Sequence, residues 1–228
     1  MENIAETLKK IHIRIDAASN KYGRDDGPVR LVAVSKTQPF DRVLAAIQAG
    51  QTEFGENYAR EALVKINELR RPGLVWHFIG PVQSNKTRLL AENVDWVHTV
   101  DSLRIAKRLS DARPAHLPEL NICLQVNISS ESSKSGTDPA HLPELAQQVA
   151  ALPRLRLRGL MVIPAAGQDF ERQRIPFRRT RRLLEQLNAS GLQLDTLSMG
   201  MSDDLEAAIA EGATIVRVGT AIFGARQT

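Results

Sequence analysis

Eight short apolar runs alternate with segments of helical spacing along the chain, and this alternation restricts the fold more than any other feature. The runs lie roughly at residues 30–36, 52–54, 75–79, 94–100, 122–127, 155–163, 192–198 and 214–218. Strands alternating with helices predict a parallel sheet, and eight such units predict closure into an α/β (β/α)8 TIM barrel. The competing architecture is an open flavodoxin-like sheet, which generally has fewer strands and would leave some runs without a place.

The helices expected between these runs begin at residue 41, near 57, near 84, and at 102, 139, 176 and 203. Ahead of the first run, Ile4, Leu8, Ile11 and Ile15 recur at steps of three or four residues, which predicts an extra amphipathic N-terminal helix. We expect residues 1–29 to form this helix and a connector, residues 30–224 to form the barrel, and residues 1–228 to form one domain.

Composition excludes several classes of function. Thirty basic residues against 26 acidic ones give a formal charge of +4, too small an excess to predict a nucleic-acid partner. No apolar stretch approaches membrane-spanning length, and the first residues do not resemble a secretory signal. The single cysteine, Cys123, lies in an apolar run and is expected to be a buried hydrophobe. We therefore expect a cytoplasmic protein without disulfides, acting as a monomer or a weak dimer.

The histidines and the cysteine show no spacing typical of a metal site. The five histidines are scattered, and neither a His-x-x-x-His pair nor a Cys-x-x-Cys pair occurs. A phosphate-binding Walker loop and a dinucleotide glycine fingerprint are also missing from the sequence. We expect no bound metal.

Lys36 ends the first apolar run, where active sites are built in barrels of this kind. The low dielectric of a barrel mouth favours an uncharged lysine amine, which can condense with an aldehyde. Most lysines at strand ends simply reach into solvent, so the position of Lys36 alone is weak support. The other residues expected at the mouth must decide its role.

The loops after the seventh and eighth runs are those that most often form a phosphate site in such barrels. Residues 198–204 form the first loop, and Arg217, Gly219 and Thr220 belong to the end of the eighth unit. Backbone amides and the hydroxyls of Ser202 and Thr220 would donate hydrogen bonds to phosphate oxygens. The sequence therefore predicts an amine and a phosphate seat facing each other.

Capping offers a second interpretation of the loop at residues 198–204. Ser202 or Asp203 could cap the following helix, with Glu206 completing a capping box. The two roles are compatible, provided that the carboxylates of Asp203 and Asp204 turn away from a bound phosphate.

Asn57 and His77 also lie at or near the ends of strands expected to face the mouth. Each has an ordinary structural alternative. Asn57 is a good helix N-cap, and His77, which alternates with Trp76 and Phe78, could be a hydrogen-bonded residue inside the barrel.

Several long motifs, taken together and in order, closely resemble the YggS/PROSC family of pyridoxal phosphate homeostasis proteins. They span residues 33–37, 54–58, 76–86, 133–136, 159–161 and 197–209. The resemblance implies a barrel like the N-terminal domain of alanine racemase, with pyridoxal 5'-phosphate (PLP) held on Lys36 as a Schiff base. It also implies that Arg217 faces the pyridine nitrogen and that Ser202, Gly219 and Thr220 contact the phosphate. We add Asn57, His77 and Met199 as candidate cofactor-binding residues.

The same resemblance implies a carrier that buffers PLP or delivers it to apoenzymes, without catalytic residues. A PLP-dependent racemase or lyase of narrow scope is the alternative. A two-base racemase needs an acid-base group opposite the lysine, and neither tyrosine of this sequence, Tyr22 or Tyr58, is an obvious candidate. A third possibility is a phosphate-binding barrel without pyridoxal chemistry.

Two further lysines compete with Lys36 as the reactive amine. They are Lys86 and Lys134, the second in a loop that could reach the mouth or serve transfer of the cofactor. Gln38 is a departure from the family, since many relatives have a second lysine there.

Overall fold

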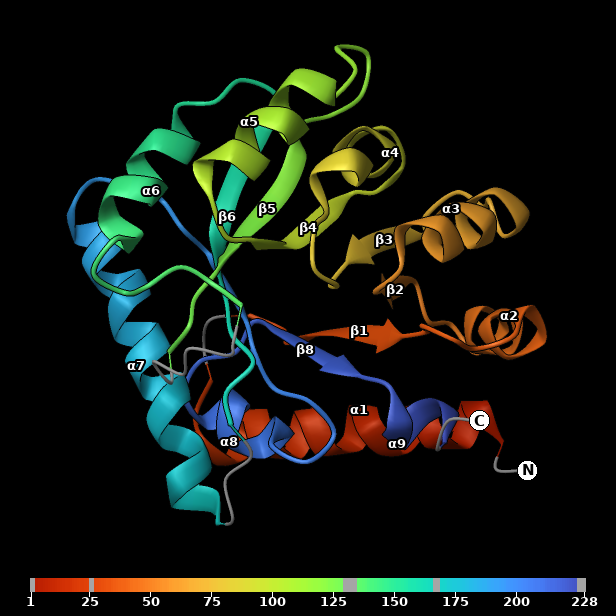
Figure 1. The fold of residues 1–228 in the computed structure, drawn as a ribbon. Coiled ribbons are helices and arrows are strands. Elements are labelled where there is room, and N and C mark those ends of the chain that lie inside the picture. Colours follow the sequence, from red (N-terminus) through yellow and green to blue (C-terminus); the bar gives the residue numbers. More distant parts are fainter. Residues whose placement is uncertain (1–2, 25–26, 129–134, 166–168, 225–228) are drawn as a thin grey trace.

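Eight parallel strands close into a barrel in sequence order (Figure 1), which confirms the predicted fold. This computed structural model describes residues 3–24, 27–128, 135–165 and 169–224. The strands are β1 (Arg30–Val34), β2 (Glu53–Glu56), β3 (Val75–Phe78), β4 (Trp96–Val100), β5 (Leu120–Gln125), β6 (Leu155–Met161), β7 (Thr196–Ser198) and β8 (Ile215–Val218). The pairing of β8 with β1 closes the barrel, and because neighbouring strands are parallel, their C-termini all lie at one mouth.

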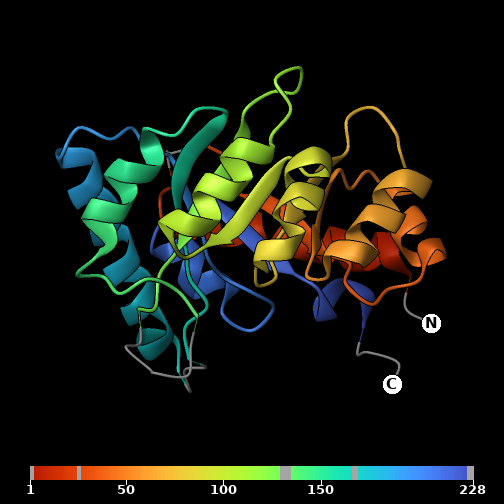
Figure 2. The ribbon, with the colours of Figure 1, turned by 45° about the horizontal axis from the view of Figure 1, so that its top comes forward.

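Helices cover the outside of the barrel, and α3 to α6 lie side by side over the strands (Figure 2). The helices that follow β1 to β7 are α2 (Phe40–Gln48), α3 (Ala59–Glu68), α4 (Thr87–Asn93) after the short 3-10 turn η1 (Ser84–Lys86), α5 (Leu103–Ala112), α6 (Leu142–Ala150), α7 (Phe170–Ala189) and α8 (Leu205–Ala210). Their buried apolar faces complete the main core against the strands.

The predicted N-terminal helix is α1 (Ile4–Lys21), and it packs against α8 and the short α9 (Thr220–Phe223). Asn3 caps it by accepting a hydrogen bond from the amide of Ala5. The Thr7 hydroxyl lies 3.0 Å from the carbonyl of Ile222, which ties α1 to the segment after β8. This packing brings the middle of α1 close to the loops that end β7 and β8.

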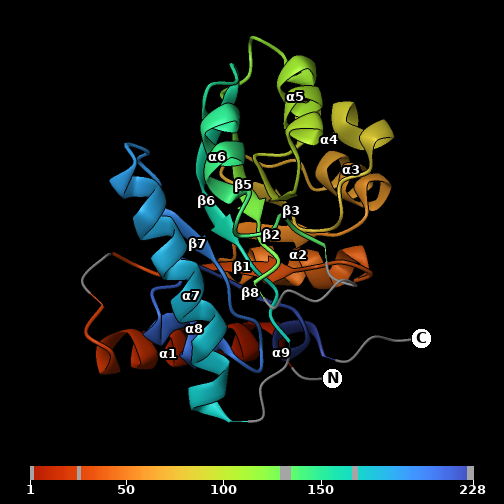
Figure 3. The same cartoon turned by 60° about the vertical axis from the view of Figure 1, so that its left-hand side comes forward.

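The predicted start of α7 at Pro176 is wrong, because the helix begins six residues earlier and lies across α8 (Figure 3). The Asp169 side chain accepts a hydrogen bond from the amide of Arg172 at 2.9 Å, a cap that starts the helix at Phe170. Pro176 then lies inside the helix, and the Thr180 hydroxyl donates to its carbonyl. The burial of Phe177 and Thr180 on the same face holds this segment helical despite the proline.

The lower interior of the barrel is filled by a second small apolar cluster around Trp96. The guanidinium groups of Arg30 and Arg158 lie 4.9 and 4.8 Å from the centre of the Trp96 ring. Cys123 belongs to this cluster and is fully buried, and burial raises the pKa of its thiol to about 12. The thiol is thus an inert core group, as the sequence predicted.

Glu211, just after α8, is 1% exposed and accepts hydrogen bonds from Arg174 and Arg178 of α7. Burial by itself would raise the pKa of this carboxyl, but the bonds from the two arginines outweigh burial and lower it. The resulting stability is present above the unfolded pKa of about 4.3 and is lost as pH falls through the lower folded value.

A Glu211→Gln variant should therefore lose about 1–2 kcal/mol of unfolding free energy at pH 7, a modest cost because the arginines are part exposed. Chemical denaturation at pH 7 and at pH 3 measures it. The gap between variant and wild type should narrow in acid, and a gap that widens there would contradict the ion-pair account.

Gly159 in β6 is required by the close approach of β7. A Cβ atom at this position would lie 1.8 Å from the carbonyl oxygen of Thr196. Gly159→Ala is expected to cost more than about 3 kcal/mol of unfolding free energy, since the colliding atom belongs to the backbone and cannot rotate away.

Alanine at Gly73 is the control, where the backbone φ is 85° but the space is open. That change should cost about 1 kcal/mol. Equal losses in urea denaturation would show that the contact between β6 and β7 is not the reason for Gly159.

Candidate functional site

A cavity of about 490 Å³ opens at the C-terminal ends of the strands, between β1, β8 and the loop after β7. Its volume lies in the range of small-molecule sites, about 300–1,000 Å³. The lining residues are Arg14, Val34, Lys36, Asn57, Ile79, Ile163, Met201, Ser202, Asp203, Arg217, Gly219, Thr220 and Ala221. An amine, two guanidinium groups and two hydroxyls thus face one space.

Six of the eight predicted site residues line this cavity, and the structure does not bring the other two to it. The six are Lys36, Asn57, Ser202, Arg217, Gly219 and Thr220. Met199 is fully buried in the main core, and His77 lies inside the barrel, 1% exposed and bonded to His98. The hydrogen-bonded interior position foreseen as the alternative for His77 is the one observed.

The two carboxylates in the loop after β7 differ, because Asp203 lines the cavity whereas Asp204 turns back onto its own loop. Asp204 Oδ1 accepts a hydrogen bond from the amide of Met201 at 2.6 Å, so this carboxylate folds back onto its own loop. Gly200 has a φ of 95°, and a Cβ there would lie 2.6 Å from the Ala208 Cβ. The loop therefore needs glycine at this point to fold against α8.

The predicted capping box at α8 is wrong. Asp204, rather than Ser202 or Asp203, occupies the N-cap position, and no side chain makes a capping bond there. Glu206 instead forms an ion pair with Arg14 of α1, with 2.8 Å between Nε and Oε1. The Ser202 side chain is thus not engaged as a cap and lines the cavity.

Arg14 is the functional candidate that the sequence did not reveal. Its Nη2 donates to both Glu206 and the carbonyl of Ser202, each at 3.0 Å. Its guanidinium, which stays protonated and is paired with Glu206, thereby braces the loop after β7 beside Ser202 on the wall of the cavity. On a helical wheel Arg14 is one of several polar residues of α1, and no sequence signal distinguishes it.

The eighth strand ends in a close backbone approach at Gly219. A Cβ there would lie 3.2 Å from the Val34 carbonyl oxygen, so glycine lets the segment after β8 pass close to β1. Thr220 follows at an exposed position on the cavity wall. Its hydroxyl, at the start of α9, and that of Ser202, in the loop after β7, line the same cavity, as the sequence predicted.

The residue before Lys36 is held by buried polar groups. The Ser35 hydroxyl lies 2.6 Å from Glu56 Oε1, and the Ser35 carbonyl accepts a hydrogen bond from the Lys65 amine at 2.5 Å. Lys65 and Glu56 form an ion pair at 2.8 Å, with side chains 4% and 1% exposed. Burial raises the pKa of Glu56, although Lys65 and Ser35 oppose this shift.

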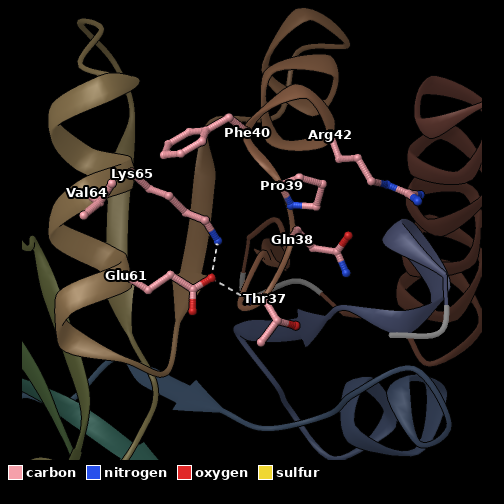
Figure 4. Close-up of a pocket in the computed structure, with 8 residues that line it drawn as sticks. All are labelled: Thr37, Gln38, Pro39, Phe40, Arg42, Glu61, Val64 and Lys65. Atoms are coloured by element: carbon pink, nitrogen blue, oxygen red, sulfur yellow. Dashed lines mark hydrogen bonds and ion pairs between the residues drawn. The ribbon is translucent and has the colours of Figure 1, made fainter. Parts of the chain in front are cut away.

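The residue after Lys36 is held by the same cluster (Figure 4). Glu61 accepts hydrogen bonds from the Thr37 amide and from the Lys65 amine, both at 2.6 Å. Thr37 has a φ of 61°, a strained value for a β-branched residue. The cluster thus fixes the backbone on both sides of Lys36. A second cavity of about 560 Å³ lies here, and Gln38 and Arg42 line it with side chains that point away from Glu61.

Arg217 forms the floor of the mouth cavity and is 3% exposed. Its Nη1 lies 2.7 Å from the Ser198 hydroxyl and its Nη2 lies 3.0 Å from the Val162 carbonyl. Burial lowers the pKa of the guanidinium to about 10, so it remains charged at neutral pH. A buried group that only donates hydrogen bonds therefore faces whatever occupies the cavity.

Asn57 does not cap α3, whose N-cap position is Tyr58. Its Oδ1 atom is buried and has no hydrogen-bond partner among the described residues. A buried amide oxygen without a partner is costly, and a ligand in the adjoining cavity could supply that partner. Lys86 lines a neighbouring cavity beside Tyr58 rather than the mouth cavity, and Lys134 lies outside the described residues.

Two absences hold for the described part of the chain. Within residues 3–24, 27–128, 135–165 and 169–224, no group of His, Cys, Asp and Glu side chains could hold a metal ion. None of the helices in these ranges combines the length and apolar character needed to span a bilayer.

Sequence comparison assigns the family. The family described as alanine racemase, N-terminal domain, matches residues 7–227. A pyridoxal phosphate homeostasis protein of Pseudomonas aeruginosa is 59% identical over 227 residues, which cover 100% of this chain and 97% of the relative. The chain belongs to the family of pyridoxal phosphate homeostasis proteins. A homeostasis protein of Escherichia coli K12 is 55% identical over 230 residues, covering 100% of this chain and 98% of the relative.

Solved structures show the same barrel in this family. PipY of Synechococcus elongatus PCC7942, with PLP bound, has a TM-score of 0.85 and 38% identity over 97% of this chain and 100% of PipY. An alanine racemase of Clostridium difficile 630 is 13% identical with a TM-score of 0.73, covering 99% of this chain and 57% of the racemase. The homeostasis proteins and the racemase thus share a fold.

Proposed function

We propose that this homeostasis protein binds PLP in the mouth cavity, covalently through Lys36, and buffers it or delivers it to apoenzymes without turning over a substrate. The observation that supports this most is the placement of Lys36 in one cavity with Arg217, Ser202, Gly219 and Thr220. Bound PLP supplies an aldehyde that condenses with an amine and a phosphate ester that anchors it.

The residues present fit this cofactor on grounds independent of the relatives. The Asn57 amide oxygen is buried and without a protein partner, Gly219 leaves space beside Val34, and Arg14 adds positive charge beside Ser202. Arg217 stays protonated and donates, so it disfavours a proton on a ring nitrogen placed against it. An unprotonated ring nitrogen makes the ring a weaker electron sink, which suits storage of the cofactor better than carbanion chemistry.

The second candidate function is racemisation or lysis of an amino acid, which needs an acid-base group on the face opposite Lys36. Among the described residues that line the cavity, Asp203 is the sole carboxylate, and none is tyrosine, histidine or cysteine. Tyr58 is 56% exposed and lines a neighbouring cavity that shares Asn57 with this one. The positions of Asp203 and Tyr58 are the observations among the described residues that favour a second base.

The deciding experiment is spectroscopic. The purified protein should take up PLP, show visible absorption, and lose it on borohydride reduction, with the modified peptide containing Lys36. A colourless protein after saturation, or a label on Lys86 or Lys134 alone, would refute the assignment. Incubation with each amino acid should give no sustained turnover, and turnover that disappears in Tyr58→Phe would favour the racemase.

Delivery is tested separately, with an apoenzyme whose activity reports the PLP it receives. Loaded protein should restore that activity in the presence of a scavenger that destroys PLP in solution.

We place this role in the cytoplasm, because a chain with a single, buried cysteine needs no oxidising compartment.

A further inference from the structure

A chain of polar side chains crosses the interior of the barrel, from the floor of the mouth cavity toward the opposite end. Arg217 Nη1 lies 2.7 Å from Ser198 Oγ, which lies 2.7 Å from His98 Nδ1. His98 Nε2 lies 2.9 Å from His77 Nδ1, and His77 Nε2 lies 3.1 Å from Glu53 Oε2. The first four side chains are 3% exposed or less, and the five residues come from β8, β7, β4, β3 and β2.

The two ends of this chain set its direction. Arg217 can only donate, and an ionised Glu53 can only accept. The Ser198 hydroxyl therefore accepts a hydrogen bond from Arg217 and donates one to His98 Nδ1. His98 then carries its proton on Nε2 and donates to His77 Nδ1, which leaves the His77 proton on Nε2, pointing at Glu53.

The opposite arrangement leaves groups unsatisfied. If His98 carried its proton on Nδ1, the Ser198 hydroxyl would accept twice and its own proton would have no partner in the chain. His77 would then turn a lone pair toward the Glu53 carboxylate, 3.1 Å away. Both consequences cost free energy in a buried site, although the observed approach of His77 to Glu53 is bent rather than a full hydrogen bond.

The charges of the chain agree with this direction. Burial lowers the pKa of His77 and lowers that of His98 well below its usual value, so both rings are neutral. Burial would raise the pKa of Glu53, but His77 and Arg30 outweigh it and keep the carboxylate ionised. Arg30 holds this carboxylate through two hydrogen bonds of 2.9 and 2.8 Å, which anchors the far end.

We propose that Ser198, His98 and His77 are positioning residues that hold Arg217 in place and in its donating orientation at the cavity floor. The Ser198 hydroxyl and the Val162 carbonyl engage both terminal nitrogens of the guanidinium, which fixes its plane. The effect on PLP rests on the proposed function. The direction of the hydrogen bonds from Arg217 to Glu53 is a property of the protein alone.

The first test uses protein without added PLP. A His12→Gln/His116→Gln/His141→Gln variant removes the three exposed histidines and leaves His77 and His98. Nitrogen NMR of this ¹⁵N-histidine-labelled protein at pH 7 should show two neutral rings, each protonated on Nε2. A ring protonated on Nδ1, or a charged ring, would overturn the chain, whether or not the protein binds PLP.

The second test compares two buried serines. Ser198→Ala removes the link to Arg217. Ser110→Ala, in α5, removes a hydroxyl that is also buried but donates to the Pro153 carbonyl instead. PLP dissociation should accelerate about tenfold or more in Ser198→Ala, the effect of losing a hydrogen bond to a charged group. The visible band should shift in the same variant. Ser110→Ala should change neither.

Each outcome decides one of the two claims. Equal behaviour of the two serine variants would overturn the positioning role while leaving PLP binding intact. A wild-type protein that takes up no PLP would refute the proposed function. It would also rule out an effect of the Arg217–Glu53 hydrogen-bond series on the cofactor, even where NMR shows the expected tautomers.

Discussion

Replacing Lys36 by alanine is expected to abolish covalent binding of PLP while leaving the barrel folded. Lys36 lies two residues after the end of β1 and is the one lysine among the described residues that line the mouth cavity. Borohydride trapping should fall from about one label per chain to none, because no other amine among the described residues lines this cavity. Intact-mass measurement after reduction gives the stoichiometry directly, and circular dichroism checks the fold.

The matched control is Lys86→Ala, which removes a lysine from a neighbouring cavity. This variant should keep the full label. A second comparison uses pyridoxal, which has the aldehyde but lacks the phosphate. It should bind wild-type protein much more weakly, since Ser202, Thr220 and Arg14 would have no anion to engage. An unchanged label in Lys36→Ala, or equal binding of pyridoxal and PLP, would contradict the arrangement.

The repeating pattern of the sequence was sufficient to predict the barrel, because eight strand-like runs alternate with helical segments, even though single runs such as residues 52–54 are short. Boundaries were less accurate where a local signal conflicted with a long-range contact. Pro176 indicated the start of a helix, but the cap at Asp169 starts α7 before the proline. Arg174 and Arg178, on either side of Pro176, both form ion pairs with Glu211 and hold this part of the helix in place. A bond to a residue more than thirty positions away leaves no trace in local spacing.

Within the site, the residues at strand ends were predictable and those delivered by packing were not. Lys36 and Arg217 follow from the rule that barrel chemistry lies at the C-terminal ends of strands. Arg14 reaches the cavity only because α1 packs on α8 and α9. His77 was expected at the mouth because it lies near the end of a strand, whereas its contact with His98 depends on how the neighbouring strands β3 and β4 pair. Cross-strand proximity of this kind requires the register.

Replacing Lys65 by methionine is expected to lower the free energy of unfolding by about 3–5 kcal/mol at pH 7. The change removes the cation that Glu56 and Glu61 share and leaves both carboxylates without it, one of them 1% exposed. It also removes the donor to the Ser35 carbonyl, next to Lys36. Chemical denaturation measures the loss, and Lys107→Met, an exposed lysine on α5, should change stability by less than about 0.5 kcal/mol.

The pH dependence separates an unpaired carboxylate from simple loss of packing. Burial already raises the pKa of Glu56, and removing Lys65 takes away the main opposing attraction. A carboxyl whose folded pKa exceeds its unfolded value binds protons more tightly when folded, so the variant should recover stability as pH falls from 7 toward about 5. Adding Glu56→Gln to Lys65→Met should restore part of the loss at pH 7. A deficit that stays constant with pH and is unaffected by Glu56→Gln would mean that Lys65 stabilises the barrel by its methylene groups alone. The backbone around Lys36 would then not be stabilised by the buried charges of Lys65 and Glu56.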